Sequence, residues 1–179
     1  ALCLACPLGE MNLCDSVKRP ADRQQVPTQT LPSAKKVVRA RHQIIRDGEM
    51  LESVPVVCEG WAAAGSSGPR SRQQILTFLL PGDVFASSLF LDPASPVRIE
   101  AVTDVTYRTF NRTELKNALL KHPVFFKTLL LVLTREVGRA NEMLADLGYC
   151  TAEERIARLI VRLSERLTRI GLARNGVFD

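Results

Sequence analysis

Between residues 37 and 110 the apolar residues occur in short runs separated by turn-forming residues. The runs are Val54–Val57, Ile75–Leu80, Val97–Val105 and Thr106–Phe110. The second run leads into Pro81-Gly82-Asp83, which predicts a tight turn because proline fixes φ and glycine permits a positive φ. Gly65–Pro69 predicts a second turn, between two strands. Short β-branched strands with turns at this spacing predict an all-β sandwich or roll.

After Phe110 the apolar pattern takes on a helical period. A short helix is indicated by Leu115, Leu119 and Leu120, and it gives way at His122-Pro123. The strongest pattern of the chain follows, with apolar residues at alternating spacings of four and three: Phe126, Leu130, Leu133, Val137, Ala140, Leu144 and Leu147.

This stripe has the a/d spacing of a coiled coil, sustained over about three heptads. It favours a seam between the parallel helices of a homodimer, in a helix that Gly148 ends. The alternative is a helix packed against its own roll, which the further apolar residues Phe125, Leu129 and Val132 fit. Both arrangements are compatible if one face contacts the roll and the seam contacts a partner helix.

A further amphipathic helix is predicted after Thr151. Thr151 and Glu154 form a capping box, in which the side chain of each accepts a hydrogen bond from the backbone N–H of the other. The apolar face, closed by Gly171, contains Ile156, Leu159, Ile160, Leu163, Leu167 and Ile170. The opposite side carries Arg155, Arg158, Arg162, Arg166 and Arg169. We interpret these arginines as a solvated face partly paired with Glu165; a phosphate-facing stripe is the alternative.

The composition indicates a globular protein, and the sequence contains none of the common enzymatic motifs. Of 179 residues 46% are hydrophobic, and the net charge of +5 permits a nucleic-acid partner. No run of roughly 18 apolar residues is present, so we expect no membrane-spanning helix. Five unevenly spread cysteines do not suit a secreted disulfide scaffold, which favours the cytoplasm. His42 and His122 stand in no metal or nucleophile spacing, and no catalytic motif is present.

These patterns divide the chain into four segments. We expect a cysteine-containing arm at 1–36, a roll at 37–122, a long helix at 123–148 and the first part of a further domain at 149–179. The arm is punctuated by prolines and has no sustained periodicity, which predicts loose order. Because the chain has no initiator Met and stops in mid-pattern, we expect it to be a fragment.

Four motifs, in this order, resemble the Crp/Fnr family of bacterial transcription regulators: Glu59-Gly60-Trp61, Gln74–Phe85, Leu147-Gly148 and Thr151–Ala157. The resemblance implies an α+β protein with a cyclic-nucleotide-binding-like jelly roll that senses an effector. A long dimerisation helix and the start of a winged helix-turn-helix domain would follow. It also implies a homodimer with operator DNA and RNA polymerase as partners. Residues 177–179 fall where the family enters its winged reader, so we expect the recognition helix to lie outside this chain.

The cyclic-nucleotide branch of this family uses a Gly-Glu pair for the ribose and an Arg with a small hydroxyl residue for the cyclic phosphate. Here the first position reads Ala86-Ser87 and the second falls near Ser95-Pro96, with Arg98 as the nearest guanidinium. A buried phosphate needs several donors. Pairing of Arg98 with Glu100 or Asp92 is therefore the competing interpretation.

The oxygen-sensing branch resembles the amino end of the chain. Cys3, Cys6 and Cys14 have a C-x2-C-x7-C spacing similar to that of alphaproteobacterial Fnr-type regulators, which hold a [4Fe–4S] cluster. Thiolates are the usual ligands of such clusters. The family's fourth cysteine falls at about Arg108, where this chain has no thiol. If the strand of Cys58 neighbours the last strand of the roll, this ligand is displaced by one strand spacing of about 4.8 Å.

Other interpretations of the cysteines stay open. Cys150, at the joint between the two long helices, is a second candidate for the fourth ligand. Cys58 also fits the role of a small buried hydrophobic residue. The cluster of Cys3, Cys6 and Cys14 is compatible with zinc and with a dithiol–disulfide switch. A small ligand bound in the roll would require no metal at all.

Overall fold

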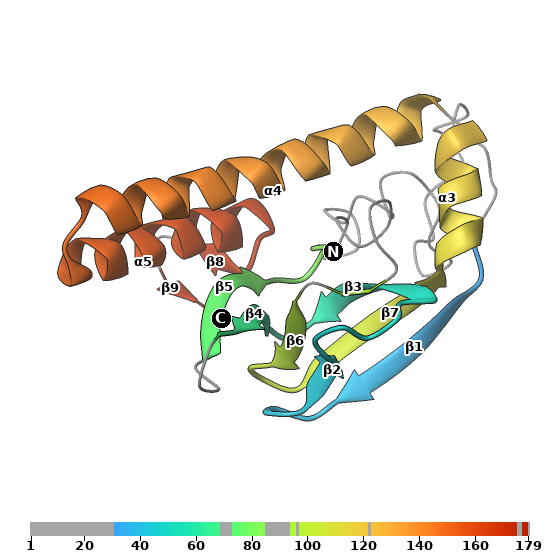
Figure 1. Ribbon diagram of the computed structural model, residues 1–179, viewed down its shortest axis with the longest axis horizontal. Coiled ribbons are helices and arrows are strands. Elements are labelled where there is room, and N and C mark those ends of the chain that lie inside the picture. The colour runs from blue at the N-terminus through green and yellow to red at the C-terminus, as the bar shows by residue number, and fades with distance from the viewer. Residues whose placement is uncertain are drawn as a thin grey trace. The chain divides into compact units, whose positions relative to one another are not determined.

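The computed structural model describes residues 31–68, 73–84, 94–95, 97–121, 123–174 and 177–178. Two compact units divide between Leu129 and Leu130. The first is a β-roll followed by a short helix, and the second is a pair of helices followed by a hairpin (Figure 1). Within the residues described, no helix is both long enough and apolar enough to cross a membrane.

The roll consists of two antiparallel sheets. One sheet has the order β1 (Ser33–Val38), β7 (Val105–Asn111), β3 (Ser53–Glu59). The other has the order β2 (Gln43–Ile45), β6 (Arg98–Ala101), β4 (Ala62–Ser67), β5 (Gln73–Leu79). Both contribute to one buried core, which includes Ile45, Val57, Ala62, Leu79, Ile99 and Val105. Burial of each large aliphatic side chain in this core contributes roughly 1.5–3 kcal/mol to the stability of the fold. The two sheets around this core confirm the predicted roll.

The turn after β5 connects the two sheets. Gly82 has a φ of 93°, which glycine adopts without strain. Asp83 closes the turn by accepting a hydrogen bond from the Leu80 N–H at 2.8 Å. The Gly82 N–H donates to Val57 O at 2.8 Å, and the Val57 N–H donates to Asp83 O at 3.1 Å. The predicted turn is therefore confirmed, and it attaches the end of β5 to β3.

Two assignments within the roll differ from the sequence prediction. β1 begins at Ser33, so residues 33–36, which we assigned to the arm, belong to the sheet. Among the described strands β1 pairs only with β7, at the edge of its sheet. Its exposed lysines remove the apolar alternation by which a strand is predicted from sequence. Gly65 lies in β4 rather than in the predicted turn. A Cβ there would lie 2.6 Å from Gln74 O, so glycine permits the close approach of β5.

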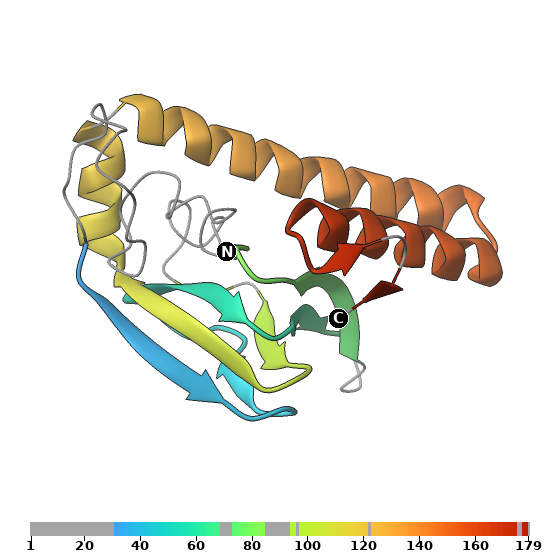
Figure 2. The ribbon, with the colours of Figure 1, turned by 180° about the vertical axis from the view of Figure 1, so that it is seen from behind.

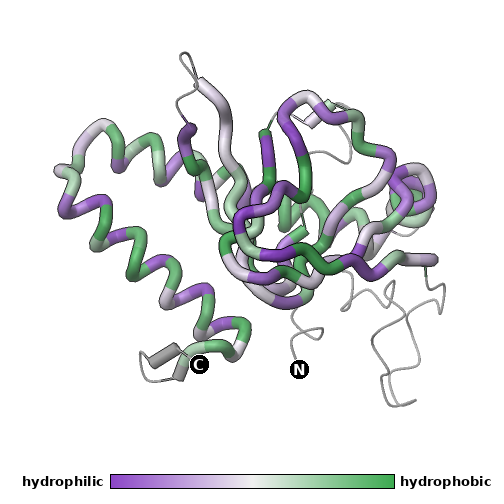
Figure 3. The backbone as a smooth tube through the Cα atoms, turned by 90° about the horizontal axis from the view of Figure 1, so that it is seen from below, coloured by the Kyte–Doolittle hydropathy of each residue, from purple (hydrophilic) through white to green (hydrophobic). Residues whose placement is uncertain are grey.

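The helices that follow the roll are α3 (Arg112–Lys121), α4 (Pro123–Tyr149) and α5 (Ala152–Arg169). β8 (Ala173–Arg174) and β9 (Val177–Phe178) form the hairpin. The predicted capping box is present: the Thr151 N–H donates to Glu154 Oε2 at 2.8 Å, and the Glu154 N–H donates to Thr151 Oγ1 at 3.3 Å. Figure 3 shows the alternating hydrophilic and hydrophobic bands of α5. The residues described contain no further element of a winged helix-turn-helix domain.

Candidate functional site

Cys58 lies at a bulge in β3, beside β7. The register of the two strands shifts between Val57 and Glu59, so Cys58 is the additional residue of the bulge. Its side chain is half-buried, and its Sγ lies 3.7 Å from Val56 O. Val56 is in turn opposite Arg108 of β7. The strand of Cys58 is therefore the direct neighbour of the strand that carries Arg108, as the sequence hypothesis requires.

The other predicted cluster ligands, Cys3, Cys6 and Cys14, lie outside the residues described. Cys150, the second candidate for the fourth ligand, lies between α4 and α5, with its Sγ 3.9 Å from Asp146 Oδ1. Within the part of the chain that the structure describes, no group of three or more His, Cys, Asp or Glu side chains is arranged so that it could hold a metal ion. Coordination of a metal by Cys58 stays a prediction.

Arg98 lies in β6, opposite Gly65 of β4. Its side chain is only 12% exposed. The guanidinium donates a hydrogen bond to Gln73 Oε1 of β5 and lies 3.7 Å from Glu100 Oε2 of its own strand. The predicted pairing with Glu100 is thus present, whereas Asp92 lies outside the residues described. The charge of Arg98 is engaged by other side chains of the roll.

The apolar stripe of α4 remains exposed in the single chain. The exposed fractions are 43% for Phe126, 47% for Leu130, 60% for Val137, 63% for Leu144 and 47% for Leu147. Of the remaining members, Leu133 is half-buried and Ala140 is exposed. By contrast, Leu129 is buried. Contiguous exposed apolar residues mark interaction surfaces, so the stripe has the property that a dimer seam requires.

Asp146, which the sequence reasoning missed, connects α4 to α5. Its carboxylate is 6% exposed and accepts hydrogen bonds from Arg158, at 3.3 Å, and from Arg162. Glu142 Oε2 lies 3.6 Å from Arg162. The partner of these two arginines is therefore Asp146 rather than the predicted Glu165. The hydrogen bond from Arg162 is the main cause that lowers the pKa of Asp146, and the charges of both arginines lower it further.

The lowered pKa of Asp146 predicts how the contact between α4 and α5 responds to acid. The contact contributes fully above the ordinary aspartate value of 3.8 and is lost as the pH falls through the lower, folded-state pKa. The carboxyl carbon resonance of Asp146 should titrate below 3.8, and Arg162→Gln should raise that midpoint. Arg155→Gln, on the same helix, is the control. If the titration midpoint of Asp146 is the same in Arg162→Gln as in the wild-type protein, Arg162 is not the main cause of the lowered pKa.

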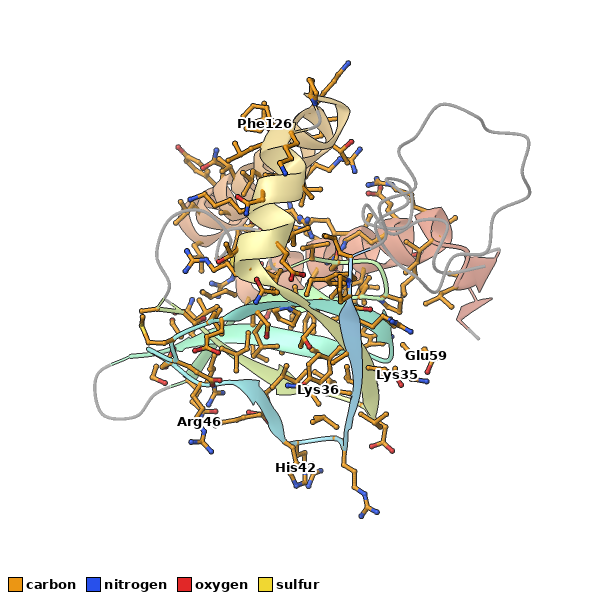
Figure 4. The ribbon with its side chains drawn as sticks, turned by 90° about the vertical axis from the view of Figure 1, so that its right-hand side faces the viewer. Lys35, Lys36, His42, Arg46, Glu59 and Phe126 are labelled. Carbon is orange, nitrogen blue, oxygen red and sulfur yellow. The ribbon has the colours of Figure 1, made fainter. Side chains whose placement is uncertain are left out.

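Sequence reasoning also missed a cationic segment at one edge of the roll, made of Lys35, Lys36, Arg39, Arg41 and Arg46. All five side chains are exposed, and none forms an ion pair within the residues described. Figure 4 shows His42 and Arg46 extending outward from this edge. The absence of any acidic residue from 35 to 46 is the sequence signal. Lysines on an edge strand oppose the addition of another strand, which accounts for the two in β1.

Comparisons with known proteins agree with this architecture. Residues 35–122 match the family described as "Cyclic nucleotide-binding domain". The CRP-like cAMP-activated global transcriptional regulator of Mycobacterium tuberculosis is 27% identical over 126 residues, which are 70% of this chain and 56% of that protein. The transcriptional activator protein Anr of Pseudomonas protegens is 28% identical over 132 residues, 74% of this chain and 54% of that protein.

The solved structure of FixK2 from Bradyrhizobium japonicum superimposes with a TM-score of 0.73 and 28% identity, and covers 83% of this chain and 71% of that one. The chain spans about half the length of the curated relatives that it matches. Both relatives are named as transcription regulators rather than enzymes, which confirms the prediction of a protein that is not an enzyme. With its roll matched as a cyclic nucleotide-binding domain and with relatives of both the CRP-like and the Anr kind, the chain belongs to the Crp/Fnr family of bacterial transcription regulators.

Proposed function

We propose that the chain is the effector-sensing and dimer-forming part of a cytoplasmic transcription regulator. The observation that carries this proposal is the exposed apolar stripe of α4, directly after a cyclic nucleotide-binding roll. Two copies of the stripe, one from each protomer, would bury each other in a parallel coiled coil. The names of the relatives support regulation of transcription. Operator DNA and RNA polymerase would be the partners of the homodimer.

The effector in this proposal is oxygen or another redox signal, sensed through a [4Fe–4S] cluster held by Cys3, Cys6, Cys14 and Cys58. Four thiols are the donor set that such a cluster takes. Two observations support Cys58: its strand adjoins β7, and its bulge is a place where a side chain is re-aimed relative to the ladder. When bound, the cluster would supply an oxygen-labile centre next to the roll.

The response to the effector would be a shift between populations. The chemistry at the arm would change how the roll packs on α4, and hence how readily the two stripes associate. A two-fold operator requires two DNA readers at a set spacing, which depends on dimer formation. Loss of the cluster would therefore change DNA binding without any contact between the cluster and DNA.

A second candidate effector is a cyclic nucleotide, or another small ligand, with no metal. It is favoured by the match of the roll to the cyclic nucleotide-binding domain and by the cAMP-activated relative. Arg98 is the residue that would bind the phosphate, after releasing Gln73 and Glu100. With this effector, cyclic AMP or cyclic GMP would raise the melting temperature of the protein, and Arg98→Ala would abolish the rise.

The two thiols of the described residues permit a test of the proposed ligand set. Cys58→Ala and Cys150→Ala would be purified without oxygen, and the iron retained per chain would be compared with that of the wild-type protein. We expect Cys58→Ala to lose most of the iron and Cys150→Ala to retain it. Retention by Cys58→Ala would refute Cys58 as a ligand. Zinc in place of iron would refute the redox cluster.

A further inference from the structure

Charged side chains of α5 contact charged side chains of α4. Arg158 and Arg162 are four residues apart and so lie on one face of α5, while Glu142 and Asp146 lie on one face of α4 in the same way. Asp146 accepts hydrogen bonds from both arginines, and Glu142 adds an ion pair with Arg162. The large apolar residues in the first half of α5 stay 41–59% exposed: Ile156, Leu159, Ile160 and Val161.

The connection between the helices brings these two charged faces together. α4 ends at Tyr149 and α5 begins at Ala152, so the joint is short. The Cys150 N–H donates to Asp146 O at 3.0 Å, and the capping box of Thr151 starts the next helix immediately. α5 therefore runs back beside the carboxyl-terminal half of α4, as Figures 1 and 2 show from opposite sides.

The charged face and the apolar stripe occupy different sides of α4. Glu142 and Asp146 each lie two residues from Leu144, a member of the stripe, which is about 200° of rotation around the helix. A partner helix on the stripe would thus leave the contact with α5 in place. Leu147 lies closer to Asp146, about 100° away, so it marks the edge of the stripe nearest to α5.

We propose that Asp146 is a latch that fixes the direction of α5 against α4 through Arg158 and Arg162. The carboxylate is almost fully covered and is held between two arginines, of which Arg162 is the less exposed. α4 and α5 then move as one rigid body. A change in the orientation of α4 at the dimer seam therefore changes the position of the residues after α5 by the same rotation. Only this last consequence depends on the proposed function; the latch itself does not.

Hydrogen exchange of the 179-residue protein, measured by mass spectrometry, tests the latch. In Asp146→Asn we expect the amides of α5 to exchange about tenfold faster, since a charge-assisted contact is lost. The amides of β7 should be unchanged, because the roll is a separate compact unit. Glu165→Gln, which removes one negative charge from the exposed side of α5, is the matched control. Asp146→Glu keeps the carboxylate and should restore part of the protection.

Equal exchange of α5 in Asp146→Asn and Glu165→Gln would overturn the latch. If Asp146→Asn also raises exchange in β7, the exchange of α5 in Arg158→Gln is compared with that in Glu165→Gln instead. The Arg158 side chain is 61% exposed, so its replacement disturbs packing little. Sedimentation of the same samples distinguishes the failure of the latch from the failure of the proposed dimer. A monomeric wild-type protein would refute the dimer, while the exchange of α5 within one chain would still report on the latch.

Discussion

A protein with Asp at position 137 is expected to sediment as a monomer at concentrations at which the wild-type protein is a dimer. Val137 is 60% exposed on α4, in the middle of the stripe. In a parallel seam the two copies of this residue meet, so Val137→Asp would bury two carboxylates without partners. We expect the dissociation constant of the dimer to rise at least about a hundredfold. Leu133→Asp should act in the same way.

The control for this prediction is Arg135→Asp, which places the same side chain on the same helix. Arg135 is exposed and lies two residues from Val137, on the opposite side of α4. It should leave the sedimentation coefficient of the dimer unchanged. If the proteins with Val137→Asp and Leu133→Asp still form dimers, the stripe is not the seam. The alternative, in which α4 packs against its own roll, would then be favoured.

Gly60→Ala is expected to destabilise the roll by about 3 kcal/mol, the sum of a backbone and a steric contribution. Gly60 has a φ of 78°, which other residues adopt only with strain. A Cβ at this position would also lie 2.0 Å from Asp104 O and 2.8 Å from Thr103 Oγ1. These atoms belong to the connection between β6 and β7, which pair with β4 and β3 respectively, so the connection has little freedom to move aside.

Gly48→Ala separates the two contributions. Gly48 has a φ of 71°, but a Cβ there would meet nothing within 4 Å. Gly48→Ala should therefore lower the free energy of unfolding by only about 1 kcal/mol, from the backbone conformation alone. Urea unfolding of both variants, followed by circular dichroism, measures the difference. Equal losses of stability would contradict the close approach of Asp104 to Gly60.

The sequence alone predicted those features that follow from the spacing of residues along the chain. The stripe of α4, the Pro81-Gly82-Asp83 turn and the capping box of Thr151 each follow from local spacing, and each is present. β1 was missed because it is an edge strand whose lysines face solvent, and so its pattern carries no alternation. Gly65 was assigned to a turn because sequence does not distinguish a glycine that bends the chain from one that admits a neighbouring strand.

The charged partners could not be predicted in the same way. We interpreted the arginines of α5 as a solvated face partly paired with Glu165, which is close to them in sequence. Asp146 is 12 and 16 residues away from its two arginines. Its role follows only once the short joint folds α5 back along α4. Nor could the sequence establish that the strand of Cys58 adjoins β7, because strand order depends on how the whole roll closes.

The iron and acid-labile sulfide content of wild-type protein purified without oxygen shows whether the cysteine arm holds a redox-sensing cluster. The proposal predicts about four of each per chain, with both lost on exposure to air. Zinc alone, or no metal and no sulfide, would contradict it. The latter result, together with stabilisation by cyclic AMP or cyclic GMP that depends on Arg98, would move effector recognition from the arm to the roll.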